Sequence, residues 1–141
     1  GLNKVLRDEF NNPIKFIRIV NEPKNLKSLS DNSVFSIHED SKGNIWIGTF
    51  GGGLNKITVD QKDNLVPEIV RYSKADGLTS NEVYAILEDE SENLWISTNN
   101  VISKYNSTED KFTNLHVSDG LQDVNFRKFE YHKGANGLMY F

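Results

Sequence analysis

One phrase of 18 residues occurs twice in this chain, and the second copy begins 49 residues after the first. The copies span residues 32–49 and 81–98, so Trp46 corresponds to Trp95 and Thr49 to Thr98. A repeat of this period is typical of stacked supersecondary units, each of which buries its apolar surface against its neighbours. The chain is therefore constrained to a repeat array. Such an array usually binds or scaffolds through its assembled surface, which argues against a search for one catalytic cluster.

Composition bounds the class of protein. The chain has 141 residues, of which 37% are hydrophobic and 26% charged, enough for one soluble domain with a core. It has no apolar run of the ~18 residues that a membrane span needs, and no secretion signal. We expect no membrane contact by this segment. Because residues 1–4 begin in the middle of the repeat pattern, we expect the chain to be cut from something larger.

Charge and cysteine content exclude further classes. The net charge of −4 comes from 20 acidic and 16 basic residues that are mixed along the chain. Nucleic-acid binding favours a basic stripe, and the sequence has none, so we expect no nucleic-acid partner. The chain has no cysteine, which excludes disulfides and thiolate metal sites.

Each copy of the phrase predicts two short strands joined by a tight turn. The strands are rich in aliphatic and aromatic residues, as β-strands prefer. The turns are 40–44 and 89–93, where an Asp carboxylate can accept from nearby backbone amides. Gly43 can supply a positive φ angle, but Glu92 stands at the equivalent position. The second turn must therefore use another conformation or tolerate strain.

The repeat extends beyond the phrase. Residues 1–5 copy residues 53–57, and a third, weaker copy ends the chain with Tyr140 at the tryptophan position. The chain therefore divides into three units of four strands each, approximately 1–52, 53–99 and 100–141.

Four antiparallel strands in 40–50 residues are typical of a β-propeller blade. We therefore predict an all-β fold of about three four-stranded blades. Complete propellers have about 4–8 blades, so this propeller is incomplete. Trp46, Trp95 and Tyr140 recur at one position of the repeat and are expected to pack between blades.

The phrase resembles the two-component regulator propeller repeat. That pattern combines Asn-x-Val-x-x-Ile-x-Glu-Asp, a Gly-Asn turn, Trp-Ile-Gly-Thr, and a glycine-rich turn into a Gly-Leu strand. Residues 32–57 match it closely, and residues 77–105 match with Glu92 and Ser97 in place of two glycines. The end of the chain, from Gly120 to Phe141, resembles the divergent last repeats of these arrays.

The resemblance implies the periplasmic sensor region of a membrane-bound hybrid histidine kinase that senses oligosaccharides. Family members add further propeller blades, an immunoglobulin-like domain, a membrane helix and kinase modules. This segment would then be a non-catalytic part that binds a glycan or relays its binding. The alternatives are a propeller scaffold for protein interactions and, third, a propeller lyase or glycan-cleaving enzyme, which would need convergent acid, base or metal residues.

Other candidate chemistry has a simpler explanation. The glycines at 51–53 lack the Lys-Ser/Thr and the helix of a phosphate loop, so they predict a hairpin. His38, His116 and His132 have no motif-spaced partners, which favours packing or surface roles over a metal site. The acid pairs 39–40 and 88–89 recur in consecutive repeats, which favours exposed turn caps over acid–base catalysis. We expect no catalytic residue, metal or cofactor.

Ligand contacts are expected among residues that do not repeat, because loops on a rigid scaffold carry function. The candidates are Phe50, Asn99, Asn100 and Arg127.

The ends of the chain predict self-association. The strand at Gly1–Val5 normally follows a tryptophan strand, and Leu138–Phe141 is a strand of the tryptophan type without its partner. Open strand edges pair with other chains. Two copies are therefore expected to associate head to tail, as a six-bladed ring in which these segments pair.

Overall fold

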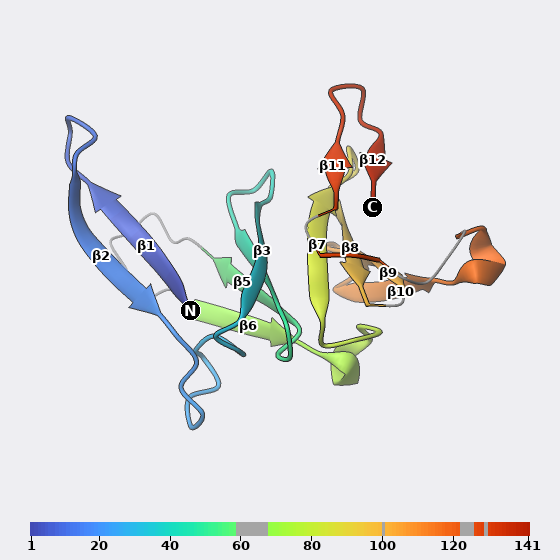
Figure 1. Ribbon diagram of the computed structural model, residues 1–141, viewed down its shortest axis with the longest axis horizontal. Helices are drawn as coiled ribbons and strands as arrows, with labels where there is room; N and C mark the ends of the chain where they lie inside the picture. The colour runs from blue at the N-terminus through green and yellow to red at the C-terminus, as the bar shows by residue number, and fades with distance from the viewer. Residues whose placement is uncertain (59–67, 100, 122–125, 129) are drawn as a thin grey trace.

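The computed structural model describes residues 1–58, 68–99, 101–121, 126–128 and 130–141. The chain forms strands with two short 3-10 turns, η1 (Lys74–Asp76) and η2 (Val117–Asp119). Antiparallel pairing gives two four-stranded sheets and two hairpins (Figure 1). The strands are β1 (Leu2–Arg7), β2 (Pro13–Ile19), β3 (Val34–Glu39), β4 (Ile45–Thr49), β5 (Leu54–Thr58), β6 (Glu68–Tyr72), β7 (Val83–Glu88), β8 (Asn93–Thr98), β9 (Ile102–Asn106), β10 (Lys111–Leu115), β11 (His132–Lys133) and β12 (Met139–Tyr140).

The predicted all-β fold of four-stranded antiparallel blades is confirmed. One blade has the strand order β3-β4-β5-β6, and the other has the order β10-β9-β8-β7. Hairpin β1–β2 lies beside the first blade and hairpin β11–β12 beside the second (Figure 1). Each predicted unit contains four strands, but a sheet takes two strands from one unit and two from the next. The unit boundaries at 52/53 and 99/100 therefore fall in the middle of a sheet and stay a prediction about the sequence repeat.

Strand alternation divides the buried residues between the two faces of the first blade. Ile47 points to a cluster with Ile19, Leu29, Ile57 and Ile69, on the face toward hairpin β1–β2. The neighbouring Trp46 points to the opposite face and packs with residues of the second blade. Successive side chains of a strand point to opposite faces, so one short strand supplies two cores.

The two blades meet most closely along their first strands. A Cβ added to Gly48 would lie 2.3 Å from Oγ of Ser36 in the same blade and 2.5 Å from Cγ1 of Val83, on strand β7 of the next blade. Glycine therefore leaves room at this point both for Ser36 and for the next blade. Ser97, the equivalent residue of the second blade, is itself buried.

A β-bulge interrupts the first strand of both blades. In the first blade the pairing moves from Val34↔Thr49 to Ser36↔Gly48, and in the second from Val83↔Thr98 to Ala85↔Ser97. Phe35 and Tyr84 are the extra residues. Bulges bend a strand and re-aim a side chain, so these two rings are directed differently from their neighbours.

Candidate functional site

The Asp turns of the two blades have one geometry. Asp40 Oδ1 accepts from the backbone N–H groups of Lys42 and Asn44, at 3.0 and 2.8 Å. Asp89 makes the same contacts to Ser91 and Asn93, both at 2.9 Å. The predicted Asp turn is therefore confirmed in both copies.

The backbone at Glu92 shows which conformation the second turn adopts, a point that the sequence left open. Gly43 has φ = 80°, and Glu92 adopts φ = 62° at the equivalent position. The second turn keeps the left-handed conformation and tolerates the strain of a side chain there.

The Asp of each turn also binds the tryptophan of the same repeat. Oδ2 of Asp40 accepts from the Trp46 indole Nε1–H at 2.7 Å, and Asp89 accepts from Trp95 at 2.8 Å. Burial raises the pKa of Asp40, but hydrogen bonds from Trp46 and Asn44 outweigh it, so the pKa lies below the ordinary 3.8. The pKa of Asp89 is lowered by the same balance. These carboxylates are held ionised by structural donors, which does not suit general acid–base chemistry.

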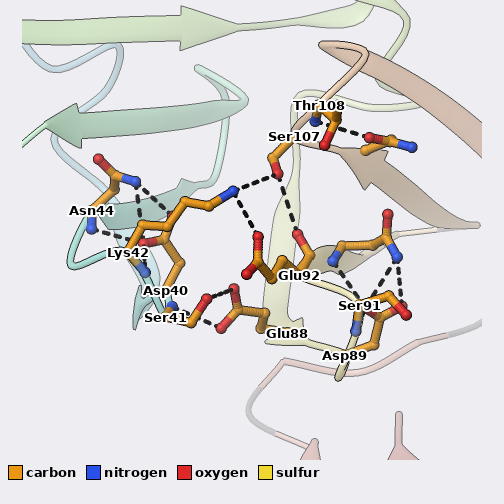
Figure 2. Close-up of polar contacts among 12 residues, drawn as sticks. Asp40, Ser41, Lys42, Asn44, Glu88, Asp89, Ser91, Glu92, Ser107 and Thr108 are labelled. Atoms are coloured by element: carbon orange, nitrogen blue, oxygen red, sulfur yellow. Dashed lines mark hydrogen bonds and ion pairs between the residues drawn. The ribbon is translucent and has the colours of Figure 1, made fainter.

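The turn of the first blade also contacts the second blade (Figure 2). Glu88 accepts from the backbone N–H and the hydroxyl of Ser41, each at 2.9 Å. Lys42 pairs with Glu92 at 2.8 Å and donates to Ser107 Oγ at 3.3 Å. Glu88 and Glu92 of the second blade thus hold the turn of the first blade.

Aromatic side chains fill the junction between the two blades. Trp46 is 1% exposed, stacks on Tyr72 at a centroid distance of 5.8 Å and meets Tyr105 of the next blade edge-on at 5.2 Å. The hydroxyls of Tyr72 and Tyr105 lie 3.1 Å apart, and both donate to Asp110. Burial raises the pKa of both phenols, so they stay protonated donors.

A second aromatic group lies at the bulges of the first strands. Phe35 and Phe50 have a centroid distance of 5.3 Å, and Phe35 lies 6.1 Å from Tyr84 of the next blade. The Nζ of Lys128 lies over all three rings, at 4.4 Å from Phe35, 4.8 Å from Phe50 and 5.8 Å from Tyr84. We call these four residues the bulge cage. It joins both blades to the third repeat.

A cavity of about 640 Å³ opens on the other side of the second blade. Its lining includes Trp95, Leu115, Phe126, Arg127 and Leu138. Trp95 is half-buried here, whereas its counterpart Trp46 is covered by Tyr105 from the third strand of the next blade. Beyond β10, the only strands among the described residues are those of hairpin β11–β12, and this hairpin does not cover Trp95 in that way.

The three predicted ligand residues that the structure describes lie in different surroundings. Phe50 is 44% exposed and belongs to the bulge cage. Arg127 is exposed and lines the cavity, whose lining includes neither Phe50 nor Asn99. Asn99 is half-buried, with an Oδ1 that has no hydrogen-bond partner. Asn100 lies outside the described residues.

The residues predicted to pack between blades differ in their surroundings. Trp46 lies in the junction core, and Trp95 lines the cavity. Tyr140 is 57% exposed, so the packing expected of it has no counterpart within the described chain.

The histidines do not assemble a metal site. His38 is half-buried on β3, and burial lowers its pKa although Glu88 and Asp40 oppose that effect. His116 and His132 are exposed. Within the described ranges, no three His, Cys, Asp or Glu side chains are grouped to hold a metal ion.

Sequence reasoning missed two features. The Asp–Trp hydrogen bond could have been found, because both residues recur six positions apart in each copy. The bulge cage was partly visible in the sequence, since Phe35 and Tyr84 are aromatic residues at the same position of the repeat. Lys128 gave none, because its position over the rings depends on how the third repeat folds back.

Comparison with known proteins identifies the repeat. The family model described as two component regulator propeller matches residues 28–51 and 77–100. Both copies of the repeated phrase lie within the stretches that match this repeat. No curated protein matches it. In the described residues, no helix is long and apolar enough to cross a membrane.

Solved structures resemble the chain to different degrees. The chain resembles an extracellular domain assigned to the hybrid two component system BT3049 from B. thetaiotaomicron, with a TM-score of 0.74 and 26% sequence identity. The match covers 97% of this chain and 17% of that chain. An extracellular domain assigned to the hybrid two component system BT4673 of the same organism matches with a TM-score of 0.48 and 18% identity, over 81% of this chain and 23% of that one.

Proposed function

We propose that this chain is a non-catalytic segment of the periplasmic sensor region of a hybrid two-component histidine kinase, and that it binds an oligosaccharide or relays its binding. The observation that carries the proposal is the match of 97% of the chain to an extracellular domain assigned to such a system. The match spans only 17% of that chain, so the kinase, the membrane anchor and the ligand belong to the proposal.

The contacts of the carboxylates support a non-catalytic role. Asp40 and Asp89 are each committed to a turn and an indole, and Glu88 is committed to Ser41. An enzyme would need a free acid, base or metal at one rim. If the chain relays binding, we propose that the signal passes through the junctions between blades. Packed interfaces have discrete arrangements, and a ligand can favour one of them over another.

Thermal unfolding of the chain with a panel of oligosaccharides tests the proposal. Ligand at 100 times its Kd adds about 2.7 kcal/mol to the free energy of unfolding, so a binding glycan raises the Tm by several degrees. Monosaccharides serve as controls for general solvent effects. Absence of a shift with every glycan, together with capture of a native protein partner, would favour the scaffold instead. Glycan cleavage in the same mixtures would show an enzyme.

We also propose that isolated chains associate head to tail. Strand β12 stands where β4 stands in the first blade, and β4 pairs with β5. The sequence of β1 copies that of β5, so β1 of a second copy fits the free edge of β12. Apolar side chains near both edges are exposed: Leu138 (56%), Tyr140 (57%) and Phe16 (65%).

Light scattering across a concentration series measures this association. We expect the mass to rise above that of the 16.0 kDa monomer between about 1 and 100 µM, in the range of many transient contacts. A proline at Lys4 removes a backbone donor from β1 and should reduce the association. A monomer at every concentration would contradict the proposal.

A further inference from the structure

The bulge cage places a cation where the surrounding side chains do not neutralise it. Lys128 Nζ lies over three rings, but within the described residues it has no carboxylate oxygen at ion-pair distance. Lys42 and Lys104 do have such partners, Glu92 at 2.8 Å and Asp89 at 3.8 Å. Ring faces attract an ammonium group through their quadrupole but do not cancel its charge. The Lys128 charge therefore remains available to an external anion.

The acid closest in sequence to the rings is otherwise engaged. Glu82 Oε2 accepts from the Tyr84 hydroxyl at 2.9 Å, which also fixes that ring. Lys128 itself is exposed, and Phe50 is 44% exposed. The ammonium N–H donors and an apolar ring surface are thus presented together.

The backbone indicates that this arrangement is built into the repeat. Phe35 and Tyr84 are the bulged residues of two successive first strands, at equivalent positions. Bulges are frequent beside functional sites, where they re-aim a side chain. A third ring, Phe50, is fixed by the hydrogen bond from its backbone N–H to Ser33 O at 3.0 Å.

We propose that the bulge cage is a binding site for an anionic saccharide, with the Lys128 ammonium on a carboxylate or sulfate and the Phe50 ring against the C–H face of a pyranose. This inference rests on the proposed sensor function and narrows its ligand class. It places the ligand where both blades and the third repeat meet, so binding would bridge three repeats.

Calorimetric titration of the full chain with matched pairs of glycans tests the site. The pairs are trigalacturonate with its methyl ester, and a sulfated carrageenan tetrasaccharide with its desulfated form. Within each pair the sugar backbone is the same and the anionic group is neutralised or removed, and the two pairs separate carboxylate from sulfate. In at least one pair, we expect the anionic glycan to bind at least tenfold more tightly than the neutral glycan. Raising NaCl from 50 to 500 mM should weaken that binding, because an exposed ion pair is screened.

Variants assign the binding to the cage. Lys128→Gln should weaken the anionic glycan about tenfold, Lys128→Arg should retain most of the affinity, and Phe50→Leu should weaken both members of a pair. Lys104→Gln is the matched control, because Lys104 also lies over a ring, Trp95 at 5.2 Å, but is paired with Asp89. It should leave binding unchanged. Thermal unfolding of each variant confirms that it is folded.

Four outcomes overturn the inference. The charged and neutral members of each pair could bind equally well, with no effect of Lys128→Gln. That result would exclude a role for the Lys128 charge in binding but would leave the proposed oligosaccharide sensor intact. Equal weakening by Lys128→Gln and Lys104→Gln would show general electrostatics and no cage site. Failure of both pairs, while another glycan raises the Tm, would reject this site alone. Failure of every glycan would reject this site and, with it, the binding part of the proposed function.

Discussion

The two junctions of this molecule are built from the same repeat but closed to different extents. At the first, between blade β3–β6 and blade β7–β10, Trp46 is covered by Tyr105 and is 1% exposed. At the second, between blade β7–β10 and the third repeat, the equivalent Trp95 lines a cavity of about 640 Å³. Both indoles keep the same hydrogen bond to Asp. The turn that holds a tryptophan is therefore local, whereas its burial depends on the neighbouring blade.

Replacing each tryptophan by alanine gives the largest expected difference between the junctions. Trp46→Ala removes a buried ring and leaves a cavity, which costs about 3–5 kcal/mol of unfolding free energy. Trp95→Ala removes a half-buried ring from an existing cavity, and we expect roughly half that cost. Urea unfolding followed by circular dichroism measures both. Equal losses would mean that Trp95 is as well packed as Trp46, and the contrast would fail.

The approach of the blades gives the next largest effect. Gly48→Ser introduces a Cβ 2.3 Å from Ser36 Oγ and 2.5 Å from Val83 Cγ1, and overpacking of this kind costs about 1–3 kcal/mol. Ser97→Gly, the reciprocal change at the second junction, adds no atoms and should cost about 0.5–1 kcal/mol through backbone entropy. The midpoints of urea unfolding compare the two variants. If Gly48→Ser lowers the unfolding free energy no more than Ser97→Gly does, the neighbouring atoms move aside at little cost. Close approach then does not explain the glycine.

These junctions show what the sequence could predict. The turns were predictable because Asp40, Gly43 and Asn44 act within five residues, and their geometry is independent of distant contacts. Blade formation was predictable because the apolar residues alternate and the phrase repeats. The different burial of Trp46 and Trp95 was not, because it depends on Tyr105 and on strands remote in the chain. Lys128 was missed for the same reason, since no local pattern places it over rings from two blades.

Acid sensitivity should be alike at the two junctions, because both Asp turns are local. The pKa of Asp40 and of Asp89 is depressed in the folded chain. Each carboxylate therefore adds stability that is present above the unfolded pKa and lost as pH falls below about 3.8 through the folded value. Asp40→Asn and Asp89→Asn should each cost about 1 kcal/mol at pH 7, since a charge-assisted bond becomes neutral.

Urea unfolding between pH 7 and pH 3 measures this dependence. Each variant should lose less stability on acidification than the unchanged chain. If only Asp40→Asn reduces the loss of stability on acidification, then closure of the first junction, and not the turn itself, maintains the lowered pKa of Asp40.

The smallest effect isolates the strain in the second turn. Glu92 holds φ = 62° where the first turn has Gly43, and a left-handed conformation costs a residue with a side chain about 1–2 kcal/mol. Glu92→Gly removes that strain but also removes the exposed ion pair with Lys42, which contributes about 0–1 kcal/mol. Glycine also costs about 0.5–1 kcal/mol of backbone entropy on folding, so we expect a net gain of less than about 1 kcal/mol. Lys42→Gln is the control in the same urea titration, because it removes the ion pair and the hydrogen bond to Ser107 but leaves the backbone strain in place. Because the pair links the two blades, a loss of stability in Glu92→Gly would mean that the link between the blades outweighs the backbone strain, and that the second turn keeps its glutamate to hold the first junction closed.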